Sequence, residues 1–161
     1  MNHHLDQLVA NRGHKPKILV VDDQPINIRV IHGLFKSHFD VVMAMNGEQA
    51  LSQAEQHRPD LIVLDVMMPD MDGYEVCRRL KAQDNTRGIP VVFVTAHNDP
   101  ADEIKGIALG AIDFISKPIN AVLVEARVKT YITFKLQADL LRSLGVLEGL
   151  TDAANGKSPD E

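Results

Sequence analysis

The stretch VLDVMMPDMDG, residues 63–73, passes directly from apolar residues into a segment with three carboxylates. An apolar run that stops at a single acid, here Asp65, is typical of a buried strand that ends there. The Met-Met-Pro sequence after this acid predicts a turn, and Asp72 has the side chain of a helix N-cap. The stretch therefore predicts a strand, a turn and a helix, and it places Asp65 at the carboxyl end of the strand.

Four more apolar runs of similar length accompany this one along the chain. In order, the five runs are KILVV (17–21), VVMAM (41–45), LIVL (61–64), VVFV (91–94) and AIDFI (111–115). Their hydrophobicity is continuous instead of alternating, which favours strands buried on both faces, as in a parallel sheet.

The segments between the runs have the spacing of helices. Apolar residues recur every four positions at Ile26, Val30 and Leu34, at Val76 and Leu80, and at Ile104 and Ala108. Alternating strands and helices predict an α/β sandwich of three layers around one parallel sheet.

Signals for the ends of helices agree with this alternation. Asp99 precedes Pro100 as a cap before a first-turn proline, and Gly110 follows the same helix. Asp72 and Asn120 are the expected N-caps of the third and fifth helices.

Composition limits the classes of protein to which the chain can belong. Its 161 residues suffice for one domain with a core, and its net charge of -5 argues against direct nucleic-acid binding. The single cysteine, Cys77, cannot form an internal disulfide, which fits a reducing compartment. The first residues, MNHHLDQLVANRGHKP, contain no apolar core of signal-peptide length, and no run approaches the roughly 18 apolar residues of a membrane span. We therefore expect a cytoplasmic protein without membrane contact.

Polar residues follow four of the five predicted strands. Asp22 and Asp23 end the first, Asp65 the third and Thr95 the fourth, while Lys117 follows the fifth. In an open parallel sheet the carboxyl ends of the strands share one edge, and ligands bind in the crevice there.

The chemistry of this set is that of phosphoryl transfer. Three neighbouring carboxylates repel one another and require a cation, and oxygen ligands of this kind suit Mg²⁺ (or Mn²⁺). Asp65 would be the nucleophile, and the metal and the ammonium group of Lys117 would neutralise the phosphoryl oxygens.

Four motifs, ILVVDDQPIN, LIVLDVMMPDMDGYEVCRRL, IPVVFVTA and GAIDFISKPI, are together similar to the receiver domain of two-component response regulators. The resemblance covers residues 16–135. It implies a flavodoxin-like (βα)5 sandwich with a five-stranded parallel sheet in the order 2-1-3-4-5 and an extended last helix. It also implies a sensor histidine kinase or a phosphotransfer protein as the phosphoryl donor.

Matched to the motifs of this family, Asp65 is the phosphoacceptor. Asp22 and Asp23 are the acidic pair, and Asp23, Asp65 and the backbone carbonyl of Met67 are the implied metal ligands. The family usually has a cis peptide before the proline that corresponds to Pro118.

The resemblance further implies that Thr95 is the switch hydroxyl, that Phe114 is the switch aromatic and that Lys117 contacts the phosphoryl group. Met67 and His97 lie two positions beyond the acceptor and the switch threonine, so both should border the path of an attacking water. Met67 cannot orient water, which predicts a long-lived phosphoryl aspartate, and His97 would act in the opposite sense.

The two ends of the chain differ from its centre. We expect residues 1–15 to be a flexible tail and residues 136–150 to extend the last helix, which begins near Asn120. Leucines on this extension form a short, imperfect heptad stripe: Leu136, Leu140, Leu147 and Leu150.

The last residues, LEGLTDAANGKSPDE, resemble the opening of a GGDEF diguanylate cyclase domain. Residues 151–161 are therefore either a disordered tail or the start of a truncated output domain. We also expect a homodimer through the helix at 99–110, the strand at 111–115 and the last helix, with Leu136 and Leu140 in the contact.

Three alternatives accompany this interpretation. A phosphatase of the haloacid-dehalogenase type also uses an Asp nucleophile and Mg²⁺, but it carries a second acid where this chain has Met67. A flavodoxin-like flavin carrier shares the fold but needs more aromatic residues. A stand-alone receiver that signals by protein–protein contact needs no output domain.

Overall fold

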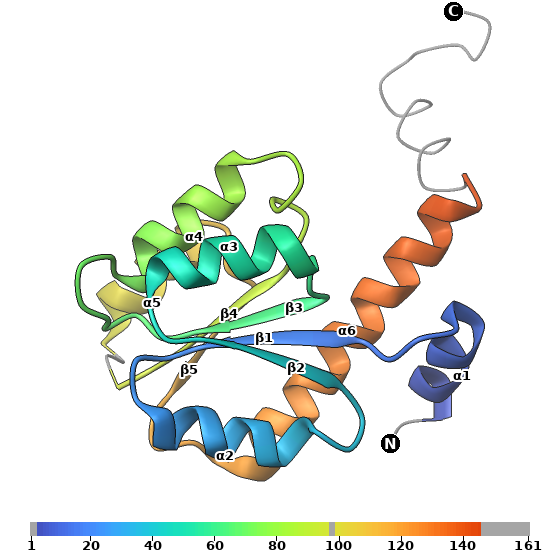
Figure 1. Ribbon diagram of the computed structural model, residues 1–161, viewed down its shortest axis with the longest axis horizontal. Coiled ribbons are helices and arrows are strands. Elements are labelled where there is room, and N and C mark those ends of the chain that lie inside the picture. The colour runs from blue at the N-terminus through green and yellow to red at the C-terminus, as the bar shows by residue number, and fades with distance from the viewer. Residues whose placement is uncertain (1–2, 97–98, 146–161) are drawn as a thin grey trace, which may run out of the picture.

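The computed structural model describes residues 3–96 and 99–145. Its centre is a five-stranded parallel sheet in the order β2-β1-β3-β4-β5 (Figure 1). The strands are β1 (Lys17–Val21), β2 (Asp40–Ala44), β3 (Leu61–Leu64), β4 (Val91–Thr95) and β5 (Asp113–Ser116). The predicted flavodoxin-like fold and its sheet order are confirmed.

Helices cover both faces of the sheet (Figure 1). The helices of the described residues are α1 (His3–Arg12), α2 (Pro25–Phe35), α3 (Gly47–His57), α4 (Gly73–Ala82), α5 (Pro100–Ala108) and α6 (Ala121–Ser143). Helices α2 and α6 pack on one face, and α3, α4 and α5 pack on the other, so the sandwich has three layers. Helix α6 continues past the sheet and lies beside α1.

The parallel register aligns the ends of neighbouring strands. Val21 of β1 pairs with Ala44 of β2 and with Leu64 of β3. The next residue after each of the neighbouring strands β1 and β3 is an aspartate, Asp22 after β1 and Asp65 after β3. The register alone therefore brings these two acids to the same edge of the sheet.

Burial of the strands follows their position in the sheet. Strands β1, β3 and β4 are buried over nearly their whole length, as their continuous hydrophobicity predicts. Strand β2 lies at the edge and is largely half-buried or exposed, so the prediction of burial on both faces is wrong for this strand. An edge strand has a neighbour on one side alone, and fewer side chains cover it.

Helix α2 has two apolar stripes, and the core uses the one that the four-residue spacing did not select. Ile26 and Val30 are exposed, whereas Ile28, Ile31 and Phe35 are buried against the sheet. The buried stripe includes an aromatic ring, so turning this side inward removes more apolar surface from water.

Helix α5 also exposes the residues that suggested it, Ile104 and Ala108. The buried residue of this helix is Gly106, which lies against the rings of Phe93 and Phe114. A residue without a side chain contacts the core here because two aromatic rings already fill the space.

The predicted helix ends are confirmed. The side chains of Asp72, Asp99 and Asn120 each accept a hydrogen bond from a backbone N–H three residues later, at 2.9, 2.9 and 3.1 Å. Gly110 ends α5 with a φ of +103°, in the left-handed region that favours glycine.

The amino-terminal segment differs from the flexible tail expected for residues 1–15, because His3–Arg12 form helix α1. Leu5 and Leu8 bury their side chains in the same core as α6, and Arg12 forms an ion pair with Asp60. A ten-residue helix with two buried leucines gives little periodic signal, and it is stabilised by tertiary contacts with distant parts of the chain.

The leucine stripe of α6 also differs from the prediction. Leu136 is 3% exposed because it lies within the core that α1 completes, so it is not free for a dimer contact as expected. Leu140, one turn further on, is 40% exposed. Leu147 and Leu150, like the predicted segment 151–161, lie outside the described residues.

None of the helices in the described part of the chain is long and apolar enough to cross a membrane.

The difference between Leu136 and Leu140 gives a test of this packing. We expect Leu136→Ala to lower the free energy of unfolding by about 2–5 kcal/mol, because it removes a buried side chain and leaves a cavity. Leu140→Ala removes the same atoms from a partly exposed position and should cost less than about 1 kcal/mol. Urea unfolding followed by circular dichroism measures both, and equal losses would contradict the burial of Leu136 under α1.

Candidate functional site

An acidic cluster lies at the carboxyl edge of the sheet. One carboxylate oxygen each from Asp22, Asp23 and Asp65 can be chosen so that all three lie within 4.8 Å of one another. Asp22 and Asp65 are buried, and Asp23 is half-buried. The structure thus brings together the three acids that the sequence predicted.

Backbone hydrogen bonds fix the two buried acids. The amide of Asp65 donates to the carbonyl of Val21 at 2.9 Å, and that of Asp22 donates to the carbonyl of Ala44 at 3.1 Å. These bonds continue the strand ladders by one residue. The amide of Gln24 donates to Oδ1 of Asp22 at 2.9 Å and holds its carboxylate in place.

Lys117 joins the cluster from the end of β5. Its Nζ lies 2.8 Å from Oδ2 of Asp22 and 3.4 Å from Oδ2 of Asp65. Its amide donates to the carbonyl of Thr95 at 2.8 Å, and the peptide bond between Lys117 and Pro118 is cis, as expected. The ammonium group therefore bridges two acids from different strands.

The electrostatics of the cluster favour a further positive charge. Burial raises the pKa of Asp65, and the charge of Asp22 raises it further, while Lys117 acts in the opposite direction. Burial alone would lower the pKa of Lys117, but its hydrogen bond to Asp22 and the charges of both acids raise it above the usual value. A single ammonium group, in contact with Asp22 and Asp65, thus faces a cluster of three carboxylates.

A cleft of about 550 Å³ opens above Asp65. Its lining is Asp23, Gln24, Asn27, Asp65, Met67, Met68, Pro69, Thr95, Ala96 and Lys117. Asp23, Asp65, Thr95 and Lys117 therefore share one cleft, whereas Asp22 is buried beside it and is not part of the lining. Thr95 is fully buried at the end of β4.

Met67 lies at the mouth of this cleft and is 54% exposed. Its amide donates to Oδ1 of Asp65 at 3.4 Å, a long hydrogen bond that restrains the acceptor carboxylate. The thioether side chain offers the cleft no acid or base.

Two predicted residues lie elsewhere. Phe114 is 7% exposed and packs in the core against Phe93, with ring centroids 6.0 Å apart. It does not line the cleft, so any effect on the site passes through β4 and β5. His97 lies outside the described residues.

Two polar residues of the cleft, Gln24 and Asn27, were not predicted from the sequence. The side-chain amide of Asn27 donates to Oε1 of Gln24 at 3.2 Å. Their signal was available, because polar residues that come after a strand-end acid at the start of a helix face the same crevice.

Gly73 is a third residue of the site that was not predicted from the sequence. A Cβ at this position would lie 2.2 Å from the carbonyl oxygen of Asp65. The amide of Gly73 donates a hydrogen bond to the carbonyl of Val66 at 2.8 Å. The loop after the acceptor therefore folds back onto the acceptor's own backbone, which requires glycine here.

The donor set fits a hard divalent cation. The cluster offers carboxylate oxygens at a solvent-accessible cleft, which suits Mg²⁺ because that ion prefers oxygen ligands and keeps several waters. An acidic triad of this kind is typical of the magnesium site of receiver domains.

Comparisons with known proteins agree with this geometry. The family model described as the response regulator receiver domain matches residues 18–129. The chain is 44% identical over 148 residues to the response regulator PleD of Caulobacter vibrioides, which covers 87% of this chain and 33% of PleD. It is 36% identical over 148 residues to a probable cyclic di-GMP phosphodiesterase of Vibrio cholerae, covering 84% of this chain and 34% of that protein. The chain thus spans about a third of the length of these two relatives.

A solved structure adds a direct comparison of the cleft. The receiver domain of a sensor histidine kinase from Pseudomonas aeruginosa, with a magnesium ion coordinated in its active site cleft, superposes with a TM-score of 0.68. The two are 31% identical, and the match covers 73% of this chain and 98% of that domain.

The close approach of Gly73 to the acceptor predicts a large effect of one methyl group. We expect Gly73→Ala to lower the free energy of unfolding by about 1–3 kcal/mol, because the backbone around Asp65 must move to admit the Cβ.

Gly33 provides a control, because the same substitution there should change the stability in the opposite direction. It lies within α2 with no atom within 4 Å of an added Cβ, so Gly33→Ala should raise the stability by about 0.5–1 kcal/mol through helix propensity. Urea unfolding of both variants checks the pair, and a neutral effect of Gly73→Ala would contradict the packing described here.

Proposed function

Because the chain belongs to the response regulator receiver domain family, we propose that it accepts a phosphoryl group on Asp65, in the cytoplasm, from a sensor histidine kinase or a phosphotransfer protein. A receiver domain is a regulatory phosphoacceptor rather than an enzyme, so the phosphatase alternative is set aside. The observation that carries the proposal is the acceptor itself, a strand-end carboxylate held beside Lys117 and two further acids.

The transfer needs an oxygen nucleophile and neutralisation of charge. A carboxylate oxygen of Asp65 forms a bond to phosphorus, and the bond from phosphorus to the donor's imidazole nitrogen breaks, with the electron pair left on nitrogen. Lys117, whose Nζ lies 3.4 Å from Asp65, would hold the phosphoryl oxygens. The amide of Met67, which donates to Asp65, would keep the attacking carboxylate oriented.

The same cluster would hold the metal. Asp22, Asp23 and Asp65, with the backbone carbonyl of Met67, are the proposed ligands for Mg²⁺ (or Mn²⁺). When bound, the ion neutralises negative charge on the carboxylates and the phosphoryl group. The magnesium described in the related Pseudomonas aeruginosa cleft supports this assignment.

The conformational response would involve Thr95 and Phe114. Thr95 is one of the residues that line the cleft, and its hydroxyl would hydrogen-bond the new phosphoryl oxygens. Thr95 and Phe114 lie on the paired strands β4 and β5, so a shift of Thr95 changes the space around the ring. Phe114 already occupies a buried position against Gly106 of α5.

The output would pass through the surface formed by α5, β5 and α6, as a homodimer contact. Exposed apolar residues lie on α5, on α6 and in the loop just before β5: Ile104, Ile107, Ile112 and Phe134. We further propose that the receiver controls cyclic di-GMP metabolism, since the end of the sequence resembles a GGDEF domain and one relative is described as a cyclic di-GMP phosphodiesterase.

The assignment of the acceptor is tested with a small phosphoryl donor. With acetyl phosphate and Mg²⁺ the wild type should gain one phosphoryl group, and Asp65→Asn should gain none because the nucleophile is removed. Asp70→Asn removes the same charge from an exposed position in the same loop and should behave as the wild type. Mass spectrometry of the intact protein at acidic pH measures both, and chelation of the metal should abolish the reaction.

The role of Met67 is tested by the lifetime of the phosphoryl group. Met67→Asn places a side chain that can orient water at the mouth of the cleft, so dephosphorylation should accelerate several-fold. Met45→Asn makes the same change at an exposed methionine that does not line the cleft. Loss of radiolabelled phosphate over time gives the rates, and equal rates for Met67→Asn and the wild type would remove Met67 from this role.

A further inference from the structure

Helix α1 lies outside the residues that match the receiver family and packs against α6 near the point where α6 leaves the body of the domain (Figure 1). Leu5 and Leu8 of α1 are buried in the core that also contains Ile132 and Leu136 of α6. The apolar side of α6 is thus covered here by a helix that the receiver fold itself does not include.

A charged contact fixes the carboxyl end of α1. Nη1 and Nη2 of Arg12 donate to the two carboxylate oxygens of Asp60 at 2.8 and 3.0 Å. Asp60 is 2% exposed and also accepts a hydrogen bond from the amide of Lys17 at 2.8 Å. A two-bond pair of this kind has a defined geometry, so it sets the position of α1 on the domain.

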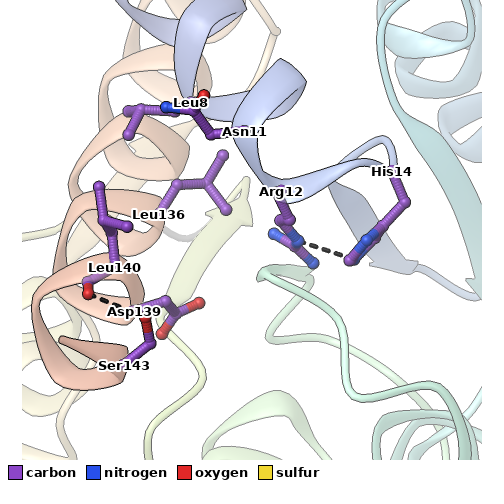
Figure 2. Close-up of a pocket in the computed structure, with 8 residues that line it drawn as sticks. All are labelled: Leu8, Asn11, Arg12, His14, Leu136, Asp139, Leu140 and Ser143. Atoms are coloured by element: carbon purple, nitrogen blue, oxygen red, sulfur yellow. Dashed lines mark hydrogen bonds between the residues drawn. The ribbon is translucent and has the colours of Figure 1, made fainter.

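Helix α1 covers this side of α6 incompletely. A groove of about 340 Å³ remains between the two helices, and in Figure 2 Leu8 and Asn11 of α1 lie on one side of it while Leu136 and Leu140 of α6 lie on the other. Ile132, Leu136 and Leu140 recur every four residues and form one apolar strip along α6. The strip runs from beneath α1 into the open groove.

We propose that α1 is an intramolecular clasp that keeps the apolar strip of α6 from pairing with the same strip of a second copy of this chain. The inference rests on the proposed function in treating α6 as the helix that carries the output. Release of α1 would expose Leu136 next to the half-exposed Leu140, and a two-fold axis would bring identical strips together.

The short length of the strip explains why a small clasp is sufficient. A stable coiled coil usually needs about three or four heptads, so pairing that relies mainly on Leu136 and Leu140 is weak. Helix α1 belongs to the same chain and competes at a high effective concentration. The contact of α1 with α6 is therefore favoured over pairing with a second copy until a change weakens that contact.

The test compares charge substitutions on the two sides of α1 in the full, unphosphorylated chain. Leu8→Asp places a charge in the contact with α6, and Gln7→Asp places the same charge on the exposed side of the same helix. Hydrogen exchange of residues 133–143 reports release of α6, and sedimentation velocity at tens of micromolar reports pairing. Arg12→Gln, which removes the ionic contact and leaves the leucines, provides a milder second variant.

We expect Leu8→Asp to raise the exchange rates of residues 133–143 several-fold and to shift the protein toward a dimer, with Arg12→Gln intermediate and Gln7→Asp like the wild type. Leu8→Asp combined with Leu140→Asp should return the protein to a monomer. If the exchange rates of residues 133–143 are unchanged in Leu8→Asp, α1 is not a clasp. If these rates rise but no dimer forms, or if the dimer persists in the Leu8→Asp, Leu140→Asp double variant, the proposed pairing of α6 is wrong.

Phosphorylation by acetyl phosphate separates this inference from the proposed function. Leu8 lies away from the cleft, so Leu8→Asp should be phosphorylated at the wild-type rate, which also shows that the receiver is folded. If no variant is phosphorylated, the proposed function fails, while the sedimentation result still decides the clasp.

Discussion

Electrostatic repulsion among Asp22, Asp23 and Asp65 is the constraint on which the rest of this structure depends. The fold holds one oxygen of each within 4.8 Å of the others, and Lys117 balances one of the three charges. Strand register and backbone hydrogen bonds prevent Asp22 and Asp65 from moving apart. The cluster therefore favours any ligand that brings positive charge, and the strand ends supply a cleft in which such a ligand and a phosphoryl group can meet.

The two ends of β3 show how a buried carboxylate is used for structure or for chemistry. Asp60, just before the strand, receives two hydrogen bonds from Arg12 and one from the amide of Lys17. Asp65, just after it, receives two long hydrogen bonds, from Lys117 and from the amide of Met67, each at 3.4 Å, and faces the charge of its acidic neighbours. The first acid is well compensated and holds α1 in place. Each oxygen of the second accepts one long hydrogen bond and keeps a lone pair for a new partner.

Close packing links the acceptor to the surface proposed for output. Gly73 lies against the acceptor's carbonyl, and the next residue, Tyr74, packs on Phe93 with ring centroids 5.4 Å apart. Phe93 in turn contacts Phe114, and both rings lie against Gly106 of α5. Because protein interiors are close-packed, a small change at the acceptor has a continuous route to α5 through these residues.

The sequence by itself determined the alternation of strands and helices, the helix caps such as Asp72 and Asn120, and the residues of the acidic cluster, because these depend on local periodicity and on the residues directly after each strand. Tertiary structure decided which stripe of α2 faces the sheet, since two stripes competed and the one with Phe35 buries more apolar surface. It also decided that α1 is a packed helix and that Leu136 is covered. Both depend on contacts of α1 with distant parts of the chain, namely helix α6 and Asp60, which pairs with Arg12. Periodicity within one segment reports that a face is apolar, and it cannot report which distant segment will cover that face.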